Sequence, residues 1–123
     1  MKPTKWPVGD ELRSRLDPHV GAAYVGPAVV GVLRIEVHIG SARSLKEKRA
    51  VLRPVLDAAR SRYRVAIAEV AYQDLHQRAA IEVAAVASAA HVVTGVLDAV
   101  ERLVWSAPDL EVISCDRHWA EQD

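Results

Sequence analysis

Two hydrophobic periods alternate along the chain, and their order restricts the fold more than any other feature of the sequence. Residues 29–39 place an aliphatic side chain at every second position, as at Leu33 and Ile35, which is typical of a half-buried β-strand. Residues 44–62 instead repeat apolar side chains every three or four positions, which is typical of an amphipathic helix. The expected elements, in chain order, are strand 29–39, helix 44–62, strand 64–71, strand 78–87, a helix capped by Ser88 and ending at Trp105, and strand 110–115.

The order β-α-β-β-α-β predicts a single domain of the α+β class. Right-handed crossovers place both helices on one face of a four-stranded antiparallel sheet. The chain has 123 residues, which suffices for one such domain. We expect this domain to span residues 28–119. Residues 1–27 are rich in proline and glycine and are expected to form a mobile N-terminal extension, with residues 120–123 as a tail.

The start of the first helix carries a capping box, formed by Ser44 and Glu47. The Ser44 hydroxyl is expected to accept a hydrogen bond from the backbone N–H of Glu47. Because these groups already serve the first turn and Glu47 is anionic, we expect anions to contact side chains and not the helix N-terminus.

Several classes of protein are excluded by what the sequence lacks. A single cysteine, Cys115, rules out an internal disulfide and suits the cytoplasm. No apolar run approaches the roughly 18 residues of a membrane helix. The glycines fit no phosphate-binding loop, and the histidines show no metal spacing. We therefore expect no enzyme, no cofactor, no metal and no small-molecule substrate.

Charge is strongly segregated along the chain, although the net charge is zero. Residues 65–123 are acidic overall, whereas residues 43–64 carry only Glu47 and Asp57 against a run of cations. These cations are Arg43, Lys46, Lys48, Arg49, Arg53, Arg60, Arg62 and Arg64. A basic segment of this kind favours an anionic partner.

One stripe of this helix is the first candidate binding surface. At 100° per residue, Lys46, Arg49, Arg53 and Arg60 fall within about 60° of one another. Arg43 and Lys48 flank the start of the helix and complete the expected nucleic-acid-binding set. Arginine matches phosphate through two parallel hydrogen bonds, so the stripe suits an RNA backbone. The alternatives are an ordinary solvated helix face and an acidic protein partner.

The polar loop at 72–78 is the second candidate. Gln73, Gln77 and Arg78 are expected to add local specificity beside the basic helix, because amides and guanidinium groups read base edges. The alternative is structural: Asp74 pairs with Arg78 and Gln73 caps the loop.

The uncovered face of the sheet is expected to carry charge and no aromatic ring. Its expected residues are Arg34, Glu36, His38, Glu69 and Glu82. RNA-recognition sheets stack bases on aromatic rings, so this face is expected to form cross-strand ion pairs or a dimer contact instead. Trp105 and Trp119 are expected to pack where a helix and a strand end.

Several segments together resemble a known bacterial family. They are residues 30–39, 42–49 with Ser-Leu-Lys-Glu-Lys-Arg, 68–70, 73–79 and 116–119. These segments are similar to the small YlxP-like proteins, labelled domain of unknown function 503, over about residues 29–119. The resemblance implies a ferredoxin-like fold and no described catalytic activity. Members are often encoded among translation and ribosome-maturation genes, which implies a ribosome-associated role.

The sequence therefore predicts a non-catalytic RNA- or ribosome-associated small protein of the cytoplasm, with a role in ribosome maturation or translation. The alternative is a homo-oligomeric protein–protein interaction module that uses the open sheet face and an edge strand. Neither hypothesis involves a membrane.

Overall fold

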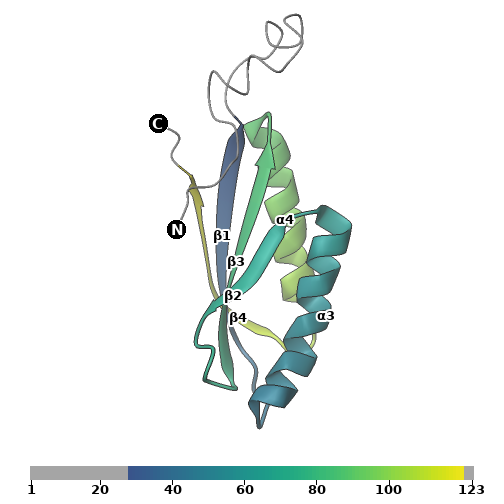
Figure 1. Ribbon diagram of the computed structural model, residues 1–123, viewed down its shortest axis with the longest axis vertical. Helices are drawn as coiled ribbons and strands as arrows, with labels where there is room; N and C mark the ends of the chain where they lie inside the picture. Colours follow the sequence, from purple (N-terminus) through teal and green to yellow (C-terminus); the bar gives the residue numbers. More distant parts are fainter. Residues whose placement is uncertain (1–27, 121–123) are drawn as a thin grey trace, which may run out of the picture.

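The computed structural model describes residues 28–120 and confirms the expected order of elements (Figure 1). The expected N-terminal extension at 1–27 and most of the expected tail lie outside the described residues. The elements are β1 (Val29–His38), α3 (Leu45–Tyr63), β2 (Ala66–Ala71), β3 (Arg78–Ala87), α4 (Ala90–Ser106) and β4 (Glu111–Trp119).

The four strands form one antiparallel sheet in the order β2-β3-β1-β4. Both helices cover the same face of this sheet, and the other face is left open (Figure 1). This arrangement is the predicted ferredoxin-like α+β fold, in which each crossover helix links two strands that are not neighbours. Consequently β2 and β4, the second and last strands of the chain, are the two edges of the sheet.

The hydrophobic core lies between the sheet and the helices. The odd-numbered side chains of β1 from Leu33 to Val37 are fully buried there, as the alternation predicts. Gly31 belongs to the same row. A Cβ at this position would lie 2.6 Å from a methyl carbon of Val93, so the missing side chain lets α4 approach the strand closely.

The capping of the helices agrees with the sequence at one helix only. Ser44 caps α3 and accepts from the Glu47 backbone N–H at 3.1 Å, as expected. The helix ends at Tyr63, and its C-cap Arg64 has a left-handed φ of 53°. Ser88 does not cap α4. The N-cap is Ala89, which makes no side-chain cap hydrogen bond.

Both edge strands differ from their expected bounds. β2 begins at Ala66 and not at residue 64, because the left-handed cap at Arg64 must first reverse the chain. β4 continues to Trp119 instead of ending at residue 115, because its ladder with β1 extends to the pair formed by Gly31 and Trp119. Ala120 still donates its N–H to the Val30 carbonyl at 2.9 Å.

Glu69 does not lie on the open face, where the sequence placed it. Its cross-strand partner is Ile81, a fully buried core residue, so the Glu69 side chain points toward the helices. The expected ion pairs of the open face are otherwise confirmed in part. Arg34 stands opposite Glu82 and pairs with it at 2.9 Å.

A candidate nucleic-acid interface on helix α3

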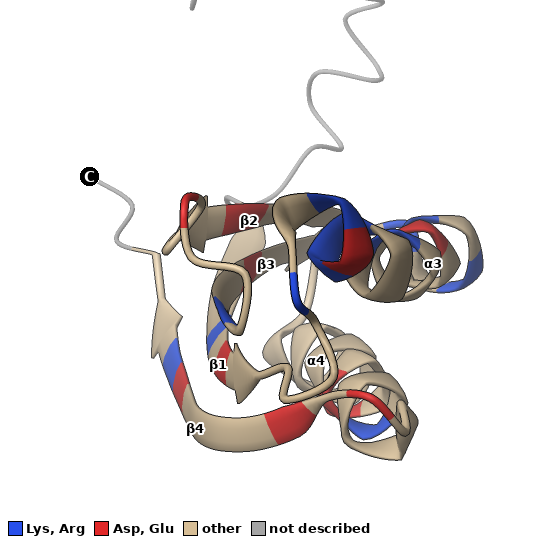
Figure 2. Ribbon diagram, turned by 90° about the horizontal axis from the view of Figure 1, so that it is seen from below, with Lys and Arg blue, Asp and Glu red and all other residues tan. Residues whose placement is uncertain are grey.

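The outer side of α3 carries exposed cations that have no internal partner. Lys46, Arg49 and Arg53 are exposed and make no ion pair with any described residue, and neither does Arg43 in the preceding loop. Figure 2 shows lysine and arginine gathered on and beside this helix, away from the acidic positions of β4. The amphipathic period that buries Leu52 therefore places these predicted residues together at the surface.

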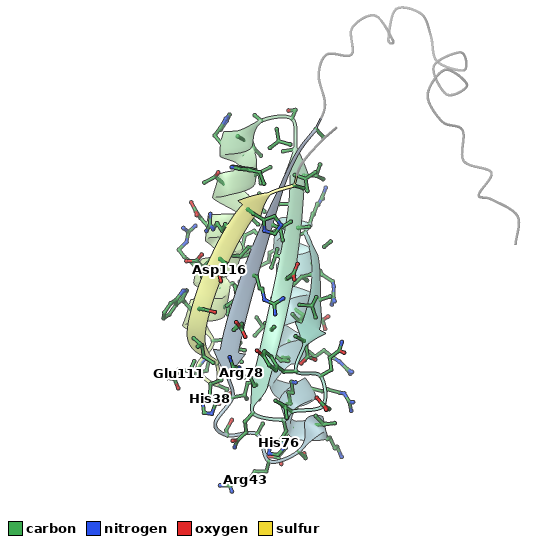
Figure 3. All side chains as sticks on the ribbon, turned by 90° about the vertical axis from the view of Figure 1, so that its left-hand side faces the viewer. His38, Arg43, His76, Arg78, Glu111 and Asp116 are labelled. Atoms are coloured by element: carbon green, nitrogen blue, oxygen red, sulfur yellow. The ribbon has the colours of Figure 1, made fainter. Side chains whose placement is uncertain are left out.

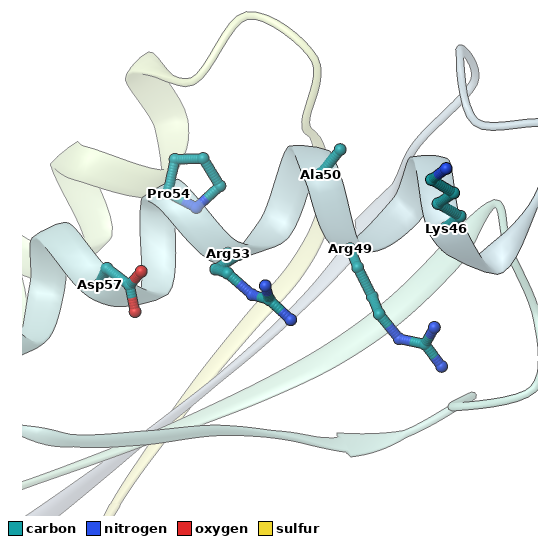
Figure 4. Close-up of a pocket in the computed structure, with 6 residues that line it drawn as sticks. All are labelled: Lys46, Arg49, Ala50, Arg53, Pro54 and Asp57. Atoms are coloured by element: carbon teal, nitrogen blue, oxygen red, sulfur yellow. The ribbon is translucent and has the colours of Figure 1, made fainter.

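The side chains of Arg49 and Arg53 extend from the same side of α3 (Figure 4). They help to line a hollow of about 560 Å³, which the small residues Ala50 and Pro54 also line. Proline has no amide N–H, so the Ala50 carbonyl lacks the usual donor four residues later and remains a hydrogen-bond acceptor.

A second hollow, of about 220 Å³, lies between α3 and the edge strand β2. It shares Arg49, Arg53 and Asp57 with the first hollow and also contacts Arg60. The two arginines therefore stand between two depressions. The acidic Asp57, which lines both hollows, pairs with Arg60 at 3.1 Å and with neither Arg49 nor Arg53.

Arg60 and Gln73, both predicted contacts, are committed to the edge of β2. Arg60 donates to the Ile67 carbonyl at 2.9 Å, and Gln73 donates to the Glu69 carbonyl at 3.3 Å. These carbonyls point away from the sheet. The two side chains thus satisfy backbone groups that an added strand would use, and their polar groups are already engaged within the domain.

Lys48 was wrongly assigned to the binding surface. Its side chain is only 2% exposed, and its ammonium donates to the carbonyls of Tyr72 and Leu75 at 2.8 and 2.6 Å. It also pairs with Glu69 beneath the helix. The sequence carried a signal for this, because Lys48 stands four residues before Leu52 and shares its core-facing stripe. Lys48 therefore anchors the 72–77 loop against the first turns of α3.

Gln77 and Arg78 also have structural partners. The Gln77 amide donates to the carbonyls of Gly40 and Ala42, both at 3.2 Å, which joins the two loops at this end of the molecule. Arg78 pairs with Glu36 at 3.2 Å and not with Asp74 as the structural alternative predicted. Gln77 thus ties the end of the 72–77 loop to residues 40–42, and Arg78 ties the start of β3 to β1.

One aromatic ring does reach the open face, contrary to expectation. Tyr72 has a left-handed φ of 62°, and its ring centroid lies 4.6 Å from the guanidinium carbon of Arg78. The Tyr72 hydroxyl, which donates to the Glu36 carboxylate, lowers the pKa of that carboxyl, and Arg78 lowers it further. Because Arg78 covers one side of the ring, this tyrosine belongs to a fixed polar cluster and is not an open stacking platform.

Of the predicted contacts, Lys46, Arg49 and Arg53 line one hollow, and these three and Arg43 make no ion pair with a described residue, while the others have structural partners. Two further exposed arginines without an ion pair to a described residue, Arg62 in the last turn of α3 and Arg64 at its C-cap, were omitted from the predicted set. Within residues 28–120, no group of three or more histidine, cysteine or acidic side chains is placed to hold a metal ion. Neither helix of this region is long and apolar enough to cross a membrane.

Comparison with known proteins identifies the family. The family model described as "Protein of unknown function (DUF503)" matches residues 30–117. The chain belongs to this DUF503 family. It is also 35% identical, over 91 residues, to the protein named "Uncharacterized protein YlxP" of Bacillus subtilis (strain 168). That match covers 74% of this chain and 99% of the relative, so it confirms the resemblance to YlxP-like proteins.

The DUF503 match spans the whole candidate surface, from the strand before Arg43 to the last strand of the sheet. The basic side of α3 and the anchored 72–77 loop therefore lie inside the family domain. Neither the family description nor the name of the relative states an activity or a partner.

Proposed function

We propose that this DUF503 protein binds RNA without catalysing a reaction, through the outer side of α3, as a ribosome-associated protein of the cytoplasm. The observation that carries the proposal is the group of free cations at Arg43, Lys46, Arg49 and Arg53. Most cations elsewhere in the described domain are neutralised, as Arg34 is by Glu82. Unpaired positive charge concentrated on one helix favours a polyanionic ligand.

The spacing of these cations suits a phosphate backbone. An α-helix rises about 1.5 Å per residue, so Lys46, Arg49 and Arg53 follow one another at roughly 4.5 and 6 Å along the axis. Successive phosphates on one strand have a comparable separation. The guanidinium groups of Arg49 and Arg53 can each bind a phosphate through two hydrogen bonds, whereas Lys46 adds a point charge.

A backbone acceptor beside the larger hollow supports RNA over DNA. Ala50 and Pro54 both line this hollow, and Pro54 has no N–H to donate to the Ala50 carbonyl. A ribose 2′-hydroxyl is a donor that DNA lacks, and such contacts let proteins distinguish the two polymers.

The loop end of the domain supports contact with unpaired nucleotides. Lys48 fixes the 72–77 loop beside the start of α3, and Figure 3 places His76 and Arg43 at this same end. The His76 imidazole is exposed and makes no hydrogen bond with any described residue. An exposed imidazole offers a face on which a splayed base can stack.

Fluorescence anisotropy with a labelled single-stranded RNA, measured over a series of salt concentrations, tests the proposal. Four neutralised phosphates on a single strand predict that log affinity falls with log salt at a slope of about −3. Arg53→Glu should weaken binding and flatten the slope. The matched control is Arg102→Glu, which makes the same charge change at an exposed, unpaired arginine of α4.

Sedimentation of the full chain with cell extract through a sucrose gradient tests the ribosomal part. We expect co-migration with a ribosomal subunit at low salt, and its loss at high salt or in an Arg49→Glu/Arg53→Glu variant. Binding that ignores both salt and these substitutions contradicts the proposed surface. Salt-sensitive binding to an acidic protein, with none to RNA, would assign α3 to a protein partner instead.

A further inference from the structure

The two edge strands of the sheet differ in whether their outward-facing backbone carbonyls have hydrogen-bond partners. On β2, the outward-facing carbonyls of Ile67 and Glu69 are occupied by Arg60 and Gln73. This is a recognised way of protecting an edge strand from pairing with another chain. Any strand addition is therefore directed to the opposite edge, β4 (Glu111–Trp119).

The pairing of β4 with β1 shows which of its backbone groups are free. Ala120 donates inward to Val30, and hydrogen-bonded positions recur every second residue in an antiparallel ladder. The backbone groups of Asp116 and His118 consequently point inward, and those of Cys115, Arg117 and Trp119 point outward. No hydrogen bond from another described residue reaches these outward groups.

We propose that β4 pairs with β4 of a second copy of this chain, antiparallel and with Arg117 on the two-fold axis, to form a continuous eight-stranded sheet. The free groups then match, since Arg117 faces its own copy and Cys115 faces Trp119 of the other copy. Each of these residue pairs exchanges both of its backbone hydrogen bonds.

Charge complementarity selects this register. With Arg117 on the axis, Asp116 of each copy stands opposite His118 of the other on the open face, so two carboxylate–imidazole contacts form. Shifting the axis to residue 116 would place Asp116 opposite its own copy. Shifting it to residue 115 would place Asp116 opposite Ser114, without a charge partner. Figure 3 labels Asp116 on β4, the outermost strand in that view.

The positive charge of Arg117, the residue on the two-fold axis, is already neutralised within each copy. Arg117 donates to Asp98 at 2.8 Å and to Glu101 at 3.1 Å, both on α4. These contacts draw the guanidinium toward the helix layer. Two copies of Arg117 can therefore approach through their backbones, with each positive charge compensated by its own carboxylates.

Two tryptophans add an apolar contribution on the helix-facing side of the same edge. Trp105 and Trp119 are 59% and 51% exposed, although the sequence predicted that they would be packed. The Trp105 indole lies close to the Cys115 thiol. The proposed register brings Trp119 of the second copy opposite Cys115, so the indoles of the two copies become neighbours. This explains exposed rings that the monomer leaves without cover.

Disulfide trapping tests the register directly. Asp116→Cys and His118→Cys are made separately in full-length Cys115→Ala protein, and an affinity tag is added to one of them. The Cα atoms of opposed residues lie about 4.5 Å apart at this kind of pair, within reach of a disulfide. Like residues lie roughly 7–8 Å apart diagonally, which is too far. We expect a disulfide-linked dimer after mixing and oxidation, and little from either variant alone.

Sedimentation equilibrium of the unmodified chain provides the second arm. We expect a dimer that Asp116→Lys weakens about tenfold and that Asp116→Lys/His118→Glu restores, as the reversed pair recovers its complementarity. Asp74→Lys, on the exposed loop far from β4, should leave the dimer unchanged. A monomer at every concentration, or equal cross-linking within single variants, overturns the proposal and leaves β4 to a strand of a different protein.

Discussion

Replacing Lys48 with methionine removes a buried ammonium while keeping a side chain of similar length. Three groups lose their partner: the carbonyls of Tyr72 and Leu75 and the carboxylate of Glu69. Removing one member of a buried ion pair costs about 3–5 kcal/mol, because the other charge is left uncompensated. The Glu69 side chain is 22% exposed, so water can partly solvate it. We therefore expect a loss of about 3 kcal/mol in the free energy of unfolding, at the lower end of that range.

Urea unfolding followed by tryptophan fluorescence measures this loss. The control is Arg34→Met, which breaks the Arg34–Glu82 pair on the open face, where the side chains are 36% and 38% exposed. An exposed pair contributes at most about 1 kcal/mol, so this variant should lie close to the unmodified protein. Lys48→Met/Glu69→Leu should recover part of the loss, since no orphan carboxylate remains. A Lys48→Met effect no larger than that of Arg34→Met would refute the anchoring role.

Two further predictions concern packing and pH. Gly31→Ala should destabilise the protein by about 1–3 kcal/mol by forcing a methyl group against Val93, whereas Gly95→Ala, with open space around it, should stabilise α4 by about 0.5–1 kcal/mol. Thermal melts of the two variants compare them directly. Because the Tyr72 hydroxyl lowers the pKa of Glu36, the stability from this group is present at neutral pH and lost on acidification. Glu36→Gln should therefore show a smaller drop in urea midpoint between neutral and acidic pH, and an equal drop would contradict this.

Local sequence patterns were sufficient to predict the order of the helices and strands. Alternation in β1, the Ser44 cap of α3 and the bounds of β3 each follow from side chains within a few positions of one another, and all three are confirmed. The C-terminal end of β4 could not be predicted from side chains close in the sequence. It depends on how far β1 offers a partner across the sheet, up to Gly31 opposite Trp119, and this pairing is a long-range property.

The candidate surface was harder to predict than the fold, because charge alone does not tell which cations already have partners within the domain. Lys46 and Lys48 look alike in the sequence, yet one is exposed and the other is buried with three partners. The period of the helix separates them, since positions two apart lie on opposite sides. Arg60 and Gln73 carry no such signal. Their carbonyl partners on β2 become neighbours only after the strand has folded beside the helix.

The anchor formed by Lys48 has a consequence for how this family could diversify. Its two hydrogen bonds in the 72–77 loop go to main-chain carbonyls, which every amino acid possesses. Substitutions at Asp74 or His76 can therefore change the chemistry that the loop displays without removing what holds its path. Natural variation or laboratory selection could retarget these positions, while a single lysine outside the loop keeps the scaffold constant.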